Sequence, residues 1–328
     1  MLDNLNALRM MTRGAYDLQK LRIATGLRLC ATFRSKLKIQ QGEDDVSDDE
    51  DLSEDAQKLI DQLKTSYGRL TDGVARNRTL PTEKGFVGDA LISDYTELVL
   101  IDQYIQIEKR ERSQFSQLTI VLEKIPIYVE HLRDVRGIGP ALAAVLITSF
   151  DITVANHVSA FWAYAGLDVA PDGRGRSKRK EHLVERTYKS AAGTEETRMS
   201  VTYNPWLKSK LMGVLAGSFL RTSDSAWKAT YDGYRHRLET DPSRHKATLV
   251  EYKRANKAGE ETSCLWTPGR IHKAAMRYMV KMFLLDFWLK WRAIEGLPIT
   301  PSYHEAKLGH RHAALTKNPQ SVREPEPV

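Results

Sequence analysis

Apolar residues recur at helical spacing along most of this chain. The three- and four-residue spacing predicts one helix over residues 1–40, a second over 54–72 and a long one from Asp89 to about His131. Asn204-Pro205 reads as a helix start, because asparagine caps a helix and proline suits its first position. Thr267-Pro268 starts a last long helix. Strand signals are few, so the pattern predicts a mainly α protein.

The long central helix carries an apolar seam interrupted by charge. The seam residues are Leu91, Tyr95, Leu98, Ile101 and Ile105, and the charged patch is Glu108 to Arg112. This arrangement predicts a helical coiled-coil segment, with the polar stretch as a register device. We expect the helix to pair with a second helix, either antiparallel or in a dimer, and packing within one chain is the alternative. We expect a homo-oligomer through the 89–131 helix, which Pro126 kinks or ends.

The tetrapeptide Gly137-Ile138-Gly139-Pro140 follows that helix. Leu132 and Val135 precede it and an apolar run follows, as in a helix-hairpin-helix. Such a turn can aim backbone N–H groups at a phosphate oxygen. We therefore predict that Gly137, Ile138 and Gly139 bind the DNA backbone without reading sequence. The alternative is a plain glycine turn between two core helices.

A second candidate for DNA contact is a basic loop. Five of the seven residues 174–180 are bases, flanked by glycines: Arg174, Arg176, Lys178, Arg179 and Lys180. We predict that this flexible loop or hairpin binds DNA. On the last helix, Lys273, Arg277, Lys281, Lys290 and Arg292 are either phosphate contacts or a solvated face, and its aromatic stripe favours core packing over base stacking.

Charge supports a polyanionic partner. The chain carries a net charge of +7, and it would carry +16 without the nine acids of residues 43–55. The acidic run reads as a disordered linker; mimicry of DNA is the alternative. The sequence contains no run of eighteen apolar residues, so no membrane span is predicted. Two distant cysteines indicate a reducing compartment, hence cytoplasmic, nucleoid-associated localisation.

These observations give an expected domain order. It is a basic amphipathic helical segment (1–40), an acidic linker (41–56), a helical coiled-coil region (57–131), a helical domain containing the helix-hairpin-helix (132–297) and a polar tail (298–328). The histidines of the tail, His304, His310 and His312, lack ligand partners at suitable spacing, so no metal site is predicted in this chain.

The order of motifs resembles a known family. Gly137-Ile138-Gly139-Pro140, Tyr164-Ala165-Gly166-Leu167, the basic loop, the helix from Asn204 and the closing helix follow one another over residues 90–295. This set resembles the C-terminal domain of DEDD-type insertion-sequence transposases ("IS one-ten" family), whose studied members are bridge-RNA-guided recombinases. The resemblance implies DNA as partner and a guide RNA as a further one.

The resemblance also implies catalytic groups. Family members begin with a RuvC-like domain that binds divalent metal, but residues 1–88 are too short and look helical, so we expect such metal only from a RuvC-like partner. The family's serine nucleophile falls nearest Ser177, although Lys178 stands where the family usually has glycine and an insertion-like stretch, 181–201, follows. A polar spacer is the alternative role of Ser177, and Ser190 and Ser200 are the other candidates.

Two functions remain open from sequence. The first is a transposase or site-specific recombinase of a mobile element that binds DNA through the hairpin and the basic loop. The second is a non-catalytic DNA-binding or structural protein derived from such a transposase.

Overall fold

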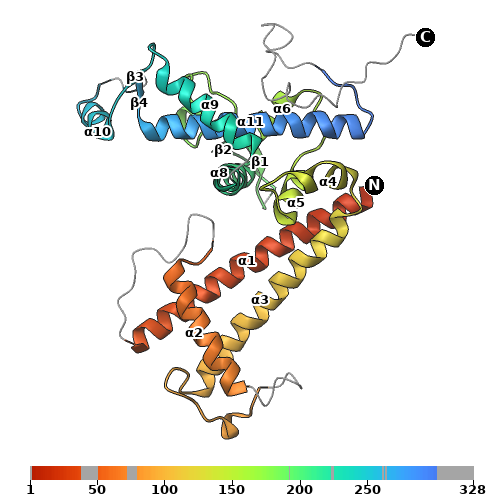
Figure 1. The fold of residues 1–328 in the computed structure, drawn as a ribbon, viewed down its shortest axis with the longest axis vertical. Helices are drawn as coiled ribbons and strands as arrows, with labels where there is room; N and C mark the ends of the chain where they lie inside the picture. The colour runs from red at the N-terminus through yellow and green to blue at the C-terminus, as the bar shows by residue number, and fades with distance from the viewer. Residues whose placement is uncertain are drawn as a thin grey trace. The chain divides into compact units, whose positions relative to one another are not determined.

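The computed structural model describes residues 2–37, 51–71, 80–191, 193–222, 225–260, 262 and 264–300 (Figure 1). These residues are mainly helical, as the sequence pattern predicts. They form two compact units, an N-terminal unit (Met1–Lys124) and a C-terminal unit (Ile125–Val328). The expected boundary lay a few residues later, at 131/132. Most of the acidic linker and of the polar tail, with its histidines, lies outside the described residues.

The N-terminal unit consists of three main helices. Helix α1 (Leu2–Leu37) and helix α3 (Tyr95–Leu122) run antiparallel side by side, and α2 (Glu54–Thr71) packs against both. A short 3-10 turn, η1 (Glu83–Gly85), precedes α3. The apolar seam of the long helix is therefore covered within the chain by α1. The homo-oligomer expected through this helix stays a prediction.

Helix α3 begins later than its apolar pattern suggests. Asp94 forms a capping box with Glu97, in which each side chain binds the other residue's backbone N–H. The Asp89 carboxylate accepts hydrogen bonds from the backbone N–H groups of Leu91 and Ile92, at 2.8 and 2.7 Å. These local bonds hold residues 89–92 in a turn, which competes with helix.

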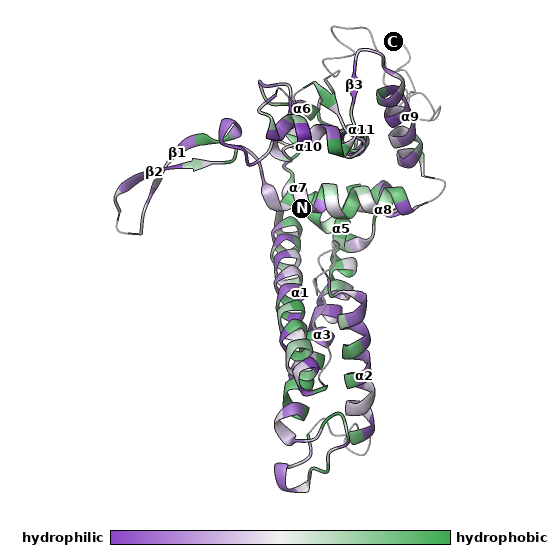
Figure 2. Cartoon of the chain, turned by 90° about the vertical axis from the view of Figure 1, so that its left-hand side faces the viewer, coloured by the Kyte–Doolittle hydropathy of each residue, from purple (hydrophilic) through white to green (hydrophobic). Residues whose placement is uncertain are grey.

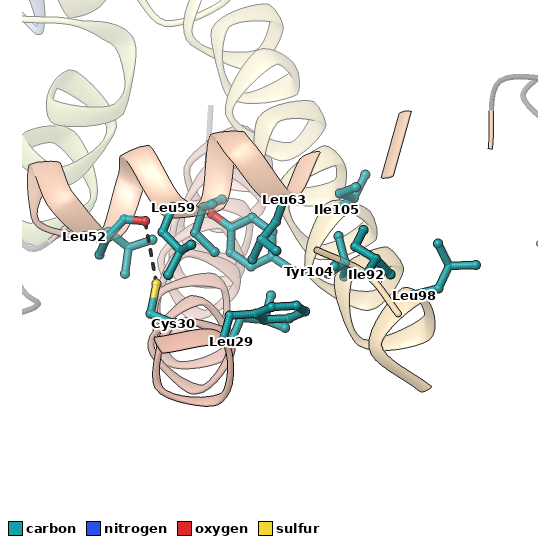
Figure 3. Close-up of a cluster of buried hydrophobic side chains, with 13 residues drawn as sticks. Leu29, Cys30, Leu52, Leu59, Leu63, Ile92, Leu98, Tyr104 and Ile105 are labelled. Carbon is teal, nitrogen blue, oxygen red and sulfur yellow. Dashed lines mark hydrogen bonds between the residues drawn. The ribbon is translucent and has the colours of Figure 1, made fainter. Parts of the chain in front are cut away.

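The core of this unit lies where the three helices meet (Figure 3). Leu29 of α1, Leu59 and Leu63 of α2 and Tyr104 of α3 are all buried there. Cys30 points into the same cluster, with its Sγ 3.6 Å from the carbonyl oxygen of Ala56. The two cysteines lie in different units, and Cys264 is exposed.

A buried ion pair joins α1 to α3. Arg22 Nε donates to Glu111 Oε2 at 2.5 Å, and both residues are less than 9% exposed. Arg22 also binds Asp51 at 3.0 Å, and Lys64 of α2 binds Glu108 at 2.6 Å. Because a buried charge requires its partner, these pairs specify which turns of the helices face each other. Two members of the charged patch, Glu108 and Glu111, thus pair within the chain, and its role as a register device stays a prediction.

The C-terminal unit is built around α11 (Pro268–Ile294). Its other helices are α4 (Pro126–Glu130), η2 (Leu132–Asp134), α5 (Pro140–Ser149), α6 (Val158–Tyr164), η3 (Lys180–His182), α7 (Pro205–Ser209), the π-helical η4 (Lys210–Leu215), α8 (Ala216–Arg221), α9 (Ala226–Thr240) and α10 (Leu249–Lys257). The short strands β3 (His245–Lys246) and β4 (Leu265–Trp266) pair in parallel.

The aromatic stripe of α11 is core, as the sequence favoured. Phe283, Phe287 and Trp288 are fully buried, and Trp288 Nε1 donates to the carbonyl oxygen of Ala155 at 2.8 Å. Arg292 is not on a solvated face: it is buried and donates to the same carbonyl at 3.0 Å. A buried guanidinium bound to carbonyl oxygens is not accessible to phosphate.

The stretch that read as an insertion forms a β-hairpin. Strands β1 (Val184–Lys189) and β2 (Glu195–Ser200) pair antiparallel, with Val184 opposite Ser200. Nearly every residue of both strands is exposed, and the hairpin extends away from the helices of its unit (Figure 2). Without a buried face, its side chains alternate weakly between apolar and polar, which explains the missing strand signal.

Candidate nucleic-acid site

The glycine turn packs on α8 through Gly137. Gly137 has a φ of +95°, a conformation that glycine adopts readily and other residues rarely do. Ser218 Oγ donates to its carbonyl oxygen at 2.7 Å, and a Cβ atom at this position would lie 3.0 Å from the Phe219 ring. Gly137 is thus needed for the fold itself.

Gly139, unlike Gly137, does not pack against another helix. It is exposed, and among the described residues no atom beyond its own chain neighbours lies within 4 Å of where its Cβ would be. It caps the N-terminus of α5, with Pro140 at the first helical position. The first-turn N–H groups of a helix lack intrahelical acceptors, so this end suits an anion. Ile138 is buried, which leaves only its backbone for contact. The helix before the turn is short, only α4 and η2.

The basic loop is a tight turn whose flanks are hydrogen-bonded. Val169 and Gly175 form an antiparallel bridge, and Arg176 N donates to Asp168 O at 3.1 Å. Asp172 closes the turn by accepting from Arg174 N at 2.9 Å. This bonding corresponds to the hairpin form of the sequence prediction.

The five bases of the loop do not share one environment. Lys178, Arg179 and Lys180 are exposed. Arg174 is half-buried, and Arg176 binds the carboxylate of Asp168 through two nitrogens at 3.0 and 2.8 Å. Lys178, Arg179 and Lys180 are therefore the bases of the loop that face solvent.

Ser177 stands at one end of a hydrogen-bonded chain of three side chains. Its Oγ lies 2.9 Å from Nδ1 of His182, and Nε2 of that imidazole lies 3.0 Å from Oδ2 of Asp172. His182 is only 2% exposed, whereas Ser177 is half-buried. A serine, a histidine and a carboxylate in this order match the arrangement by which a base activates a hydroxyl nucleophile.

The geometry assigns the histidine tautomer. The backbone N–H of Ser177 donates to His182 Nδ1 at 3.0 Å, so this nitrogen is an acceptor and carries no proton. The ring proton then lies on Nε2 and binds Asp172. The Arg174 N–H first, and the His182 side chain after it, lower the pKa of Asp172 and hold it as a carboxylate. Nδ1 is therefore the basic ring nitrogen, and the backbone N–H and the hydroxyl of Ser177 share its lone pair.

Sequence reasoning missed His182 and Asp172. His182 fell in the stretch that read as an insertion, and Asp172 was not singled out at all. They stand five residues after and five before Ser177. Equal spacing in a loop predicts no contact by itself, so no signal in the sequence marked these two residues. The competing serines have other surroundings: Ser190 Oγ lies 2.6 Å from Thr194 Oγ1 in the turn of the β1–β2 hairpin, and Ser200 ends β2.

Neither a metal cluster nor a membrane span emerges from the described part of the chain. No group of three or more histidine, cysteine, aspartate or glutamate residues there is placed to hold a metal ion. None of its helices is both long and apolar enough to cross a bilayer. Comparison of the chain with known protein families, with curated proteins and with solved structures gave no match.

Proposed function

We propose that this protein is a DNA-binding recombinase of the transposase type, in which Ser177 attacks a phosphodiester. The observation that carries the proposal is the chain from Ser177 through His182 to Asp172, set inside a loop of exposed bases. The order of motifs along the sequence supports it independently, because the serine falls where the transposase family supplies its nucleophile.

The step is a transesterification. The Ser177 hydroxyl proton passes to His182 Nδ1, Oγ forms a bond to phosphorus, and the bond from phosphorus to the departing sugar oxygen breaks. The departing oxygen takes up a proton. A phosphoserine ester conserves the energy of the broken bond, so a second strand can be joined without an external energy source. Exposed Lys178 and Arg179 supply positive charge where the phosphorus gains negative charge.

The partners follow from the same proposal. DNA binds through the hairpin end at Gly139 and the exposed bases. The resemblance adds a guide RNA, and a RuvC-like partner would supply the metal-binding domain that family members carry in the same chain. A homo-oligomer through α3 and association with the nucleoid are parts of the proposal. The second candidate is a non-catalytic DNA-binding protein; Lys178 after the serine, in place of the family's glycine, favours it.

The test is whether Ser177 behaves as an activated nucleophile. An organophosphorus fluoride needs neither guide RNA nor partner, because attack by the serine oxygen displaces fluoride from phosphorus. We expect mass spectrometry to find the label on Ser177 and to lose it in Ser177→Ala and His182→Ala. Ser190→Ala is the matched control and should label as the wild type does. Labelling that persists in Ser177→Ala, or none in the wild type, would contradict the nucleophile assignment.

DNA binding is tested separately from chemistry. The wild type should bind unrelated duplexes with similar affinity and a steep dependence on salt, and Ser177→Ala should bind as tightly. If DNA binding is found without labelling, the non-catalytic candidate is the correct one.

A further inference from the structure

Three cations from two helices lie near the loop that carries Ser177. Lys208 of α7 donates through Nζ to the carbonyl oxygen of Arg176. The guanidinium of Arg277 in α11 lies so close to Gly175 that a Cβ there would overlap it. One turn further along α11, Lys281 Nζ lies 4.2 Å from the ring centre of Trp162. The residues that Arg277 and Lys208 contact, Gly175 and Arg176, are the two residues before Ser177.

These cations are partly buried and act on one another. Burial is the main cause that lowers the pKa of Lys208, of Arg277 and of Lys281, and the Arg277 charge is the second cause for both lysines. Arg176 adds a further positive charge that acts on Lys208. Like charges brought together out of water oppose folding unless something compensates them.

Compensation among the described residues is incomplete. Asp168 acts on all three cations, but Arg176 already binds its Oδ2. Arg277 Nε is buried and has no hydrogen-bond partner in the described part of the chain, and the same holds for Asp168 Oδ1. The cluster therefore holds several positive charges against one carboxylate, and one of its donors is unsatisfied.

We propose that Lys208, Arg277 and Lys281 form a binding site for one phosphate group next to Ser177. A guanidinium offers a planar fork of donors that suits phosphate oxygens, and the two ammonium groups add point charges. Binding an anion would satisfy the unpartnered donor and neutralise the excess charge. The inference rests on the proposed function only for the source of the phosphate, a nucleic-acid backbone; free inorganic phosphate has the same chemistry.

Arg277→Met separates this role from a structural one. Removing a buried charge from a cluster of like sign should leave the melting temperature of the phosphate-free protein equal to or above that of the wild type. The same change should weaken phosphate binding about tenfold or more, as loss of a charge-assisted hydrogen bond does. Lys273→Met is the matched control, because Lys273 is exposed on the same helix.

The experiment titrates full-length protein with inorganic phosphate or a short oligodeoxynucleotide, each at constant ionic strength set by sodium chloride. We expect either probe to raise the melting temperature of the wild type and of Lys273→Met, but not of Arg277→Met. An effect of the oligonucleotide alone identifies a nucleic-acid backbone as the ligand. A rise in melting temperature with both probes identifies a general phosphate site. The inference is wrong if neither probe stabilises the wild type, or if both stabilise Arg277→Met equally.

A measurement on the wild type guards against a variant that does not fold. NMR of carbon-13-labelled lysine should show the Lys208 pKa rise when the phosphate probe is added, because an anion favours the ammonium form. An unchanged Lys208 pKa at saturating probe overturns the site. Labelling of Ser177 by the organophosphorus fluoride needs no phosphate site. If phosphate does not bind, the assignment of Ser177 as the nucleophile is therefore unaffected, and if Ser177 is not labelled, the phosphate site is unaffected.

Discussion

Lys208 donates a hydrogen bond through Nζ to the main-chain carbonyl of Arg176, the residue directly before Ser177. This hydrogen bond joins helix α7 to the basic loop and holds the backbone next to Ser177 in place. Lys208 stands two residues before the π-helical segment η4, where an extra residue per turn redirects the side chains that follow. The loop is therefore held from outside as well as by its own turn bonds.

The two glycines of the hairpin should differ in what they tolerate. Gly137→Ala should lower the free energy of unfolding by about 1 kcal/mol or more, because its φ of +95° disfavours a side chain. Gly139→Val should fold normally, since Gly139 has a φ of −89° and open space around it. Urea denaturation of both variants checks this contrast.

For DNA affinity, Gly139 should matter more than Gly137, the opposite of the order expected for stability. Gly139→Val should weaken binding to unrelated DNA sequences by similar factors, and the salt slope should fall by about one for each phosphate group that the variant no longer binds. Unchanged affinity in folded Gly139→Val would remove the hairpin from the DNA interface.

The exposed bases of the loop should matter for DNA and not for stability. Replacing Lys178, Arg179 and Lys180 by alanine should change stability by no more than about 0.5 kcal/mol per site, because all three are exposed. Filter binding across a salt series should show the slope reduced by up to about three. Alanine at Lys253, Arg254 and Lys257, exposed bases of α10, removes the same charge elsewhere; an equal loss there would mean that only net charge matters.

The buried pair between α1 and α3 should show strong coupling. Glu111→Leu removes the buried carboxylate that pairs with Arg22 and leaves the half-exposed Asp51 beside the buried charge, so it should cost about 3–5 kcal/mol. The double change Arg22→Leu with Glu111→Leu should recover most of that loss, because no unpaired charge remains. Denaturant titration of the double-mutant cycle measures the coupling, and additive single effects would show that the pair does not set the register.

Binding of phosphodiester should weaken as pH rises through about 8. Burial and the charges of Arg277 and Arg176, opposed by Asp168, lower the pKa of Lys208 from 10.5 to about 8. Lys208 is charged in the folded protein below that pH and neutral above it, whereas a phosphodiester keeps one charge throughout. The nearby Tyr203 has its pKa raised by burial and stays neutral in this range. Oligonucleotide titrations at pH 7 and pH 9 should differ for the wild type and much less for Lys208→Met.

Stability should follow the opposite trend. The unfolded chain holds a proton on Lys208 up to about pH 10.5, whereas the folded protein releases it near pH 8. Between these values the unfolded state binds more protons, so rising pH should stabilise the phosphate-free protein. Thermal denaturation of the wild type against Lys208→Met isolates this contribution; identical slopes in the two proteins would contradict the lowered pKa.

Local signals in the sequence predicted the helices well. Asn204 accepts from Leu207 N as a cap, Thr267 caps α11 in the same way, and Pro126 opens α4 shortly after the long helix ends at Leu122. Each of these depends on neighbours along the chain. The start of α3 was wrong by several residues because Asp89 and Asp94 both offered caps, and only the later one begins the helix.

Interactions between distant residues could not be predicted in this way. The partner of Arg22 lies eighty-nine residues away, and the guanidinium of Arg277 lies against Gly175, in the loop before Ser177. A basic residue on a helix reads the same in sequence whether it faces solvent or a second cation. His182 was missed for another reason, since a single histidine in a charged stretch has no pattern of its own.

The span from Asp172 to His182 contains the whole hydrogen-bonded chain that ends at Ser177. In many hydrolytic enzymes the equivalent groups come from far apart, and a long loop must close before they meet. Here the closing cost is that of one short turn. The constellation can therefore assemble early in folding, and its hydrogen bonds depend on no particular placement of the N-terminal unit. The side chains of this segment still need support from outside it, since His182 is only 2% exposed and Lys208 of α7 binds the carbonyl oxygen of Arg176.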